Sequence, residues 1–245
     1  NIILFVLKQE GAKISIINLK SIKEIYPKND KEKYRQFWEE FGFFIKEGAA
    51  TDFTHRNELI KLLRYESSKE QPGELISLED YVKRMPQSQE AIYYANGPTR
   101  EAIESGPYLE VFKKKDIEVL YTKEAIDDYV LNMLGEYEGK KLVSVDRADI
   151  KVESDEAATE GGLSEAQLQE LTKWLKDTLD PKVTEVRPSK RLVDSPAIIL
   201  CNYGSYSMQR MYQMVKKELN PVAPGILEIN PNHKLIIGLN ELRQK

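Results

Sequence analysis

The chain has 245 residues, of which 41% are hydrophobic and 31% charged, and its formal net charge is −4. This length suffices for one large domain or two ordinary ones, each with its own core. The acidic balance argues against nucleic acid or an anionic membrane as the main partner. No apolar run approaches the roughly 18 residues that a membrane span needs. The single cysteine, Cys201, excludes an internal disulfide and suits a reducing compartment.

Residues 1–90 are expected to be mainly helical. Apolar residues recur at spacings of three and four in the first long stretch, at Tyr34, Phe37, Trp38, Phe41 and Ile45. Leu59, Leu62 and Leu63 form a second, shorter stripe. Such spacing gives a helix one apolar face. Asp52 or Thr54 is a plausible N-cap for the second helix.

Residues 91–150 alternate between strand-like and helical patterns. Residues 91–95, 117–122 and 140–145 are rich in β-favouring side chains, and helical sequence lies between them, interrupted at Gly106 and Pro107. This order predicts a small parallel or mostly parallel sheet covered by helices. Residues 151–162 are acidic and end in two glycines, which indicates a linker or surface loop.

Residues 163–245 mix helices and strands. Ser164 and Gln167 have the capping-box spacing, and the helix that follows should bury one face, made of Leu168, Leu171, Trp174, Leu175 and Leu179. Residues 182–189 and 197–204 are predicted strands, the second central because its start is continuously apolar.

A last helix should follow, with Asn230 as N-cap and Pro231 as its first residue, and with Ile236, Leu239 and Leu242 facing inward. The expected fold class is therefore α/β and α+β. A helical segment and a small three-layer α/β sheet domain come first, and an α+β C-terminal domain follows.

Few residues suggest catalysis. The chain has neither a GxGxxG nor a GxxxxGK[ST] loop, and its histidines, His55 and His233, are expected at caps or turns. The Asp127-Asp128 pair is interpreted as a solvated helix face. An alternative function, a small-molecule enzyme or ligand-binding domain using the sheet of residues 91–145, would need polar groups at the strand ends. Its candidates are Asn96, Thr99 and Thr122, none of them a base or an activated nucleophile.

A methionine-rich helix is predicted near the C-terminal end. Met208, Met211, Tyr212 and Val215 fall on one face of it. Methionine packs adaptably, so this face could be ordinary core or a surface that binds varied partners. The pattern alone leaves both readings open.

Several longer segments resemble the heat-shock protein 90 chaperone family. They are LLRYESS, SLEDYVKRM and QEAIYY within residues 59–97, then PYLEVFKKKDIEVLYT and EGKKLVSV, and finally SKRLVDSPAIIL and LEINPNHKLI. The likeness is closest to bacterial HtpG-like or mitochondrial-type members. Together the segments cover most of residues 32–242 in the family's order, whereas residues 1–28 match least.

The resemblance implies a fragment of a dimeric, ATP-dependent chaperone that acts in protein folding and the stress response. Residues 1–150 would be the C-terminal part of its middle domain, and residues 163–245 its C-terminal domain without the final dimerisation helices. ATP and magnesium would bind outside this chain, which would itself hold no cofactor or metal and not be an enzyme.

The resemblance also implies partners and a compartment. The partners would be unfolded or partly folded client proteins, the protein's own ATPase domain and a second protomer, with no nucleic acid and no membrane. Met208, Met211, Tyr212 and Val215 match the positions that contact clients. The expected location is the bacterial cytoplasm or, alternatively, the mitochondrial matrix.

Overall fold

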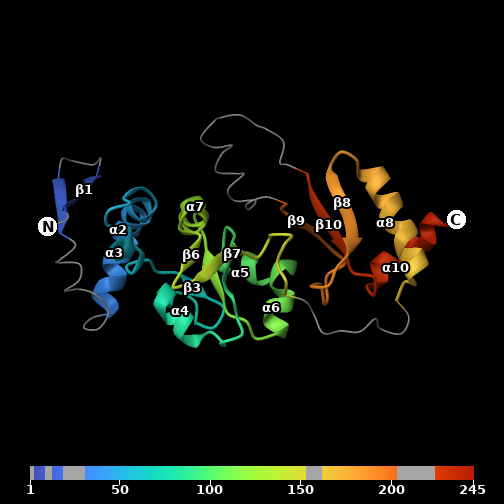
Figure 1. Ribbon diagram of the computed structural model, residues 1–245, viewed down its shortest axis with the longest axis horizontal. Coiled ribbons are helices and arrows are strands. Elements are labelled where there is room, and N and C mark those ends of the chain that lie inside the picture. The colour runs from blue at the N-terminus through green and yellow to red at the C-terminus, as the bar shows by residue number, and fades with distance from the viewer. Residues whose placement is uncertain (1–2, 9–12, 19–30, 153–161, 203–223) are drawn as a thin grey trace.

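A computed structural model describes residues 3–8, 13–18, 31–152, 162–202 and 224–245 (Figure 1). Strands β1 (Ile3–Lys8) and β2 (Lys13–Asn18) form an antiparallel pair in which Ile3 lies opposite Asn18. The expectation of a helical segment over residues 1–90 is therefore wrong for these two stretches. Both are rich in β-branched isoleucine or valine, which favours extended backbone.

Helices α2 (Lys31–Thr51), α3 (Arg56–Ile60) and α4 (Leu78–Arg84) make up the predicted helical region. The apolar stripes are confirmed, since Trp38, Ile45 and Leu59 are buried in one core cluster. The predicted N-cap of α3 is wrong, because His55 holds that position. Asp52 instead accepts hydrogen bonds from the backbone of the intervening turn and contacts the His55 ring at 2.8 Å.

The central sheet has five strands in the order β3-β5-β4-β7-β6. Their bounds are β3 (Glu66–Ser67), β4 (Ala91–Asn96), β5 (Val119–Thr122), β6 (Glu136–Tyr137) and β7 (Lys140–Ser144). β4 runs parallel to both β5 and β7, whereas the two edge strands are antiparallel to their neighbours. This confirms the mostly parallel sheet.

Helices cover both faces of this sheet. On one face Ile92, Tyr94 and Leu120 join the core cluster that includes α2, α3, α4 and α7 (Ala125–Leu134). On the other face Ala95 and Val119 pack against α5 (Arg100–Glu104), the 3-10 turn η1 (Pro107–Leu109) and α6 (Glu110–Lys114). Successive strand residues point to opposite faces, so the two cores follow from the strand period. The three-layer prediction is confirmed.

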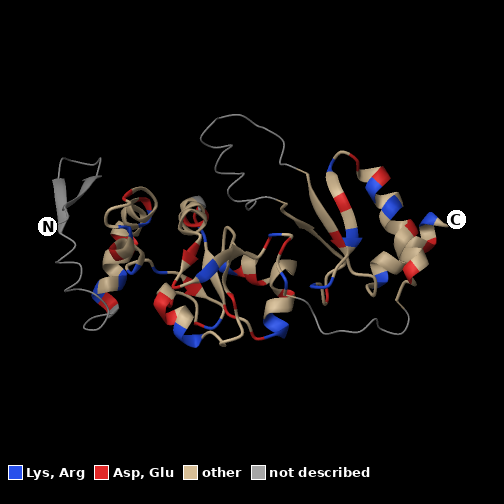
Figure 2. Cartoon of the chain, in the orientation of Figure 1, with Lys and Arg blue, Asp and Glu red and all other residues tan. Residues whose placement is uncertain are grey.

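Asp127 and Asp128 are not on a solvated face. They are 2% and 0% exposed, because α7 packs against α2. Asp127 closes a capping box with the Glu124 backbone and lies 2.7 Å from the Lys46 ammonium group. Burial raises the pKa of Asp127, and the nearby Lys46 only partly opposes that rise. Elsewhere both signs of charge alternate along the helices (Figure 2).

The C-terminal sheet has three strands in the order β8-β10-β9. Its elements are α8 (Glu165–Leu179), β8 (Val183–Pro188), β9 (Ala197–Leu200), β10 (Gly225–Ile229) and α10 (Lys234–Arg243). The strand predicted over residues 197–204 is present as β9, but its predicted central position is wrong, since β10, which was not predicted, lies in the centre. β9 is apolar although it is an edge strand, because Ile198 and Leu200 pack toward the preceding α/β segment.

The capping box of Ser164 and Gln167 is confirmed at the start of α8. Trp174 and Leu242, predicted to face inward, are 37% and 68% exposed. The start of α10 was also predicted wrongly: His233 is its N-cap, and the Asn230 side chain accepts from the Asn232 amide and donates to the Val193 carbonyl.

Candidate functional site

The predicted client-contact residues Met208, Met211, Tyr212 and Val215 lie outside the described residues. The two described ends of that segment meet at the C-terminal sheet. The Asn202 side-chain amide donates to the Thr184 hydroxyl at 2.8 Å and to the Pro224 carbonyl at 3.5 Å. Asn202 and Pro224, the described residues on either side of this segment, therefore lie close together at the C-terminal sheet.

The candidates for a small-molecule site have structural partners. The Asn96 side chain donates to the Thr122 hydroxyl at 3.0 Å, and that hydroxyl donates to the Ala95 carbonyl at 3.2 Å. Thr99 caps α5 by accepting from the Ala102 amide at 3.2 Å. Within the described ranges, no His, Cys, Asp and Glu side chains gather in a group suited to a metal, and no helix has the length and apolarity to cross a membrane. This arrangement does not favour the enzyme alternative.

The junction between the α/β segment and the C-terminal sheet carries many hydrogen bonds between residues far apart in the sequence. We use "the junction" for the contacts of residues 108–110 and 145–148 with residues 187–201. The residues before the acidic segment extend the outer edge of β9: Cys201 donates to the Asp146 carbonyl at 2.8 Å, and Ala148 donates to the Cys201 carbonyl at 3.0 Å. The Tyr108 hydroxyl donates to the Ile199 carbonyl, on the same edge of β9, at 2.8 Å. The junction therefore occupies the described edge of the strand.

A buried carboxylate organises the cationic side of the junction. Glu228, in the central strand and 4% exposed, accepts from Arg187 at 2.8 Å and from the Ser189 hydroxyl at 2.8 Å, and lies 3.5 Å from Arg191. Burial lowers the pKa of Arg191, although Glu228 opposes that shift. Because a buried charge needs both a counter-charge and hydrogen bonds, Glu228 stabilises both guanidinium groups.

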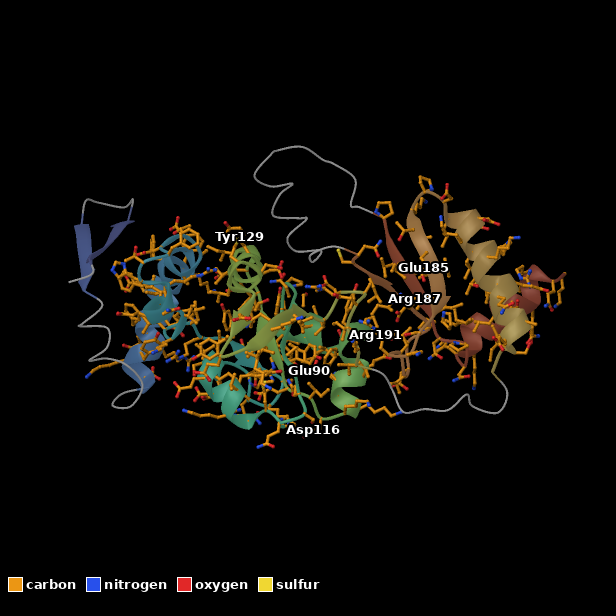
Figure 3. The ribbon with its side chains drawn as sticks, viewed as in Figure 1. Glu90, Asp116, Tyr129, Glu185, Arg187 and Arg191 are labelled. Atoms are coloured by element: carbon orange, nitrogen blue, oxygen red, sulfur yellow. The ribbon has the colours of Figure 1, made fainter. Side chains whose placement is uncertain are left out.

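Those two guanidinium groups reach across to the α/β segment. Arg191 donates to the Arg147 carbonyl at 3.1 Å, and Arg187 donates to the Ala148 carbonyl at 3.0 Å. Figure 3 shows both side chains on the side of the C-terminal sheet that faces α6. The cations thus bind the free carbonyls at the end of the α/β segment.

A second carboxylate crosses the junction in the opposite direction. Glu110, at the start of α6, accepts through Oε2 from three successive amides, of Val193 at 2.6 Å, Asp194 at 3.0 Å and Ser195 at 3.3 Å. Its Oε1 accepts from the Ser195 hydroxyl. Burial would raise the pKa of Glu110, but these hydrogen bonds outweigh it and lower the pKa below the usual value.

Apolar packing fills the space between these polar contacts. Leu192, Ile198, Leu200 and Ile226 form a buried cluster, and Tyr108 and Ala148 of the α/β segment pack against it. The junction therefore combines a small hydrophobic core with directed hydrogen bonds.

Sequence reasoning missed Glu110, Arg191 and Glu228, since charged residues are abundant throughout the chain. Only Glu228 carried a local signal. It is the one charge in the apolar strand sequence GILEI, and such a residue is seldom buried without a partner. Glu110 carried no such signal because its partners lie 83 to 85 residues away.

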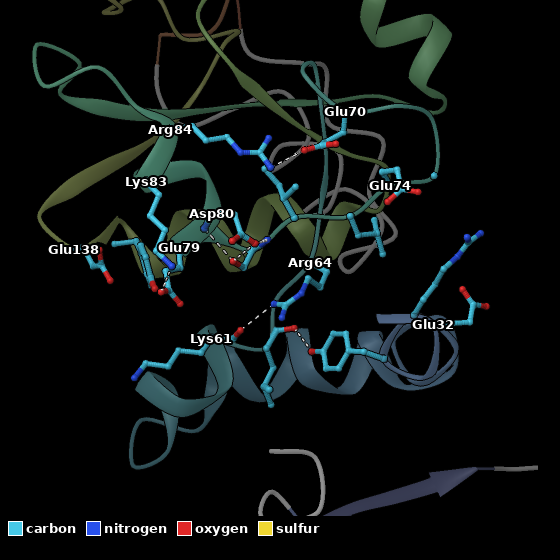
Figure 4. Close-up of a pocket in the computed structure, with 18 of the residues that line it drawn as sticks. Glu32, Lys61, Arg64, Glu70, Glu74, Glu79, Asp80, Lys83, Arg84 and Glu138 are labelled. Atoms are coloured by element: carbon cyan, nitrogen blue, oxygen red, sulfur yellow. Dashed lines mark hydrogen bonds and ion pairs between the residues drawn. The ribbon is translucent and has the colours of Figure 1, made fainter. Parts of the chain in front are cut away.

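A groove of about 870 Å³ lies between α2, α3 and α4 (Figure 4). Its walls carry both signs of charge, and many of these charges pair with one another. Arg84 meets Glu70 at 2.6 Å, and Lys83 meets Glu79 at 2.5 Å. Arg64 donates to the Lys61 carbonyl at 2.9 Å. Because its charges largely satisfy each other, the groove does not favour one class of ligand.

Comparison with known proteins decides the family. The family model described as Hsp90 protein matches residues 4–245. The chain belongs to the Hsp90 family. It is 60% identical over 220 residues to a chaperone protein HtpG of Desulfitobacterium hafniense, covering 89% of this chain and 36% of that protein. It is 48% identical over 227 residues to HtpG of Desulfotalea psychrophila, covering 88% and 36%.

A third HtpG, from Methylococcus capsulatus, is 42% identical over 219 residues, covering 86% of this chain and 34% of that protein. The chain thus spans about a third of the length of the curated relatives it matches. Within this Hsp90-family chain, four of the segments that carry the resemblance supply residues to the junction or to its buried carboxylate. Glu110 lies in PYLEV, Val145 in KLVSV, Arg191 in SKRLVDSP and Glu228 in LEIN.

Proposed function

We propose that this chain is part of an ATP-dependent molecular chaperone that binds and remodels unfolded or partly folded client proteins. The observation that carries the proposal is the 60% identity over 220 residues to a chaperone protein HtpG. This part would supply surfaces for client contact and for contact between domains. The junction supports the second role, because it joins two separately built sheets with directed bonds.

The domain assignment belongs to the same proposal. Residues 1–150 would form the later part of the middle domain, and residues 163–245 the first part of the C-terminal domain. ATP and magnesium would bind elsewhere in the whole protein, so this chain alone should hydrolyse no ATP and dimerise weakly at most. The named relatives are bacterial, which supports the bacterial cytoplasm over the mitochondrial matrix.

The proposed client contacts are Met208, Met211, Tyr212 and Val215. A client offers varied apolar side chains, and flexible thioethers can pack against many of them with little strain. A fully covered methionine contributes about 1.5–3 kcal/mol, and partial cover gives less. Several weak contacts of this kind allow both holding and release.

The test is the double variant Met208→Ser/Met211→Ser in the 245-residue chain. We expect it to suppress the aggregation of a heat-denatured model client less well than the wild type, while its melting temperature barely changes. The matched control is Met133→Ser, on an exposed methionine of α7, which should leave suppression intact.

Two results would contradict the proposal. If the double variant loses several kcal/mol of stability but still protects the client, the helix face is core and the client site is wrong. If the wild-type chain neither suppresses aggregation nor cross-links to the client, the chaperone function itself fails for this part of the protein.

A further inference from the structure

Among the contacts of the junction, two differ in how they respond to rotation. The first is the backbone pairing of residues 146–148 with Cys201, which we call the pivot. It lies where the α/β segment ends, so a small rotation about it preserves its hydrogen bonds. The second is the Glu110 carboxylate, which comes from α6 and reaches a loop on the other side of the junction.

The loop of residues 193–195 is shaped around that single carboxylate. Three consecutive amides converge on one oxygen, and the Ser195 hydroxyl bonds the other. Hydrogen bonds to an ionised carboxylate are roughly twice as strong as neutral ones, and they need close alignment. A rotation about the pivot would therefore break this cluster before it broke the pivot.

We propose that Glu110 is the latch of this junction: its carboxylate, held by residues 193–195, fixes the angle between the α/β segment and the C-terminal sheet. Release of the latch lets the two parts rotate about the pivot at residues 146–148. This proposal rests on the proposed function and deepens it, because a chaperone that remodels a client must move the surfaces that bind the client. Glu110 acts as a positioning residue and needs no contact with client or nucleotide.

The burial of the two carboxylates supports this division of roles. Glu228 and Arg191 are buried, so water cannot readily replace their mutual contacts. Glu110 and Ser195 are only half-buried, so water can solvate both once they separate. The Glu228 contacts are thus suited to permanent structure and the Glu110 contacts to reversible opening.

The experiment measures the angle directly in the 245-residue chain. Cysteines replace Glu101 on α5 and Lys173 on α8, both exposed, and carry a donor and an acceptor dye. The native Cys201 is buried and should not be labelled. Glu110→Gln should widen the distance distribution between the dyes, because the carboxamide offers one acceptor oxygen in place of two. Glu47→Gln, the same charge change on an exposed site of α2, should leave the distribution unchanged.

A second measurement reports the latch itself. Hydrogen exchange of the amides at residues 193–195 should be about tenfold faster in Glu110→Gln, the factor expected for losing about 1.4 kcal/mol of local protection. Glu110→Asp, which keeps the charge on a shorter side chain, should recover part of this protection. Ser195→Ala removes one donor only, so it should shift both measurements in the same direction as Glu110→Gln but by a smaller amount. It is the variant to use if Glu110→Gln does not fold.

The outcomes separate the possibilities. Faster exchange with an unchanged dye distance would mean that Glu110 only orders its loop, which overturns the latch. No change in either measurement also overturns it. Both readouts work without client, so a latch that behaves as expected in a chain that protects no client would reject the proposed function alone.

Discussion

The two sheets of this chain differ in what buries their faces. The five-stranded sheet is covered on both faces by helices from residues 31–134, and its core is closed within that region. Among the described residues, the three-stranded sheet packs against its own helices, α8 and α10, on one face. Its other face packs against Tyr108 and Ala148 of the preceding segment. The C-terminal sheet therefore depends on the junction, whereas the larger sheet does not depend on it to the same degree.

The buried ion pairs of the two regions differ in the same way as the sheets. In the α/β segment the Lys46–Asp127 pair at 2.7 Å joins α2 to α7, and the Glu66–Arg100 pair at 3.0 Å joins β3 to α5. Both pairs close within one region. Glu228, by contrast, holds guanidinium groups whose remaining hydrogen bonds go to the other region. Its loss should therefore disturb the C-terminal sheet and the junction together.

The largest expected effect comes from Glu228→Ala. It leaves the Arg191 guanidinium buried without its counter-charge, and breaking a buried pair in this way costs about 3–5 kcal/mol. The measurement is chemical denaturation followed by the fluorescence of Trp174, in a Trp38→Phe background, because the chain has one tryptophan in each region. Glu185→Ala, at a half-exposed position of the neighbouring strand β8, should cost about 0.5 kcal/mol or less. Equal losses for the two variants would refute the role of Glu228.

A cavity introduced by mutation into the five-stranded sheet should destabilise mainly the region that contains this sheet. Leu120 is 0% exposed in β5, beside the central strand β4 of the five-stranded sheet. Leu120→Ala should cost about 2–5 kcal/mol, from lost burial and from the cavity left behind. Denaturation followed by Trp38, in a Trp174→Phe background, should report the loss. Leu235→Ala, at an exposed site of α10, should stay within about 0.5 kcal/mol of wild type. If Trp174 reported the Leu120→Ala loss as strongly as Trp38, the two regions would unfold as one unit.

The sequence predicted what depends on near neighbours. The burial of Leu59, Leu62 and Leu63 follows from helical spacing, and the strand at residues 91–95 follows from its composition. The Ser164–Gln167 capping box is contained within four residues. Each of these features is decided over one or two turns of chain, so the pattern alone is enough.

Three of the failures involve partners that are distant in the sequence. Asp127 resembles a surface carboxylate until Lys46, far away in the sequence, is placed beside it. The strand at residues 197–200 has the continuously apolar sequence of a central strand although it lies at an edge, because Tyr108 and Ala148 pack against its apolar side chains. Glu110 and Ser195 are 85 residues apart, and no periodicity connects them. The junction is therefore the part of the fold that local pattern could not predict.

The junction should also loosen in acid. Because the folded-state pKa of Glu110 is lowered, its contribution is complete above the ordinary glutamate value of about 4.3 and is lost as the pH falls through the folded value. Asp149, whose pKa the Arg147 guanidinium lowers, titrates in the same direction nearby, and the region also holds the carboxylates of Asp146, Asp194 and Glu228. The difference in dye distance between wild type and Glu110→Gln separates the contribution of Glu110 to the pH dependence from that of the other carboxylates. It should be largest near neutral pH and vanish in acid. A difference that grows in acid would reject the assignment.

Two helix caps give the smallest effects and test whether burial sets their size. Ser77, buried at the start of α4, accepts from the Asp80 amide at 3.0 Å and donates to the Asp80 carboxylate at 2.7 Å. Ser164, exposed at the start of α8, accepts from the Gln167 amide at 3.4 Å. N-cap replacement by alanine costs about 0.5–2 kcal/mol. Ser77→Ala should fall at the upper end, because Ser77 is buried and its hydroxyl both caps the helix and donates to the Asp80 carboxylate. Ser164→Ala should fall at the lower end. The tryptophan of each region reports its own cap, and a larger loss at Ser164 would show that burial does not decide the strength of these caps.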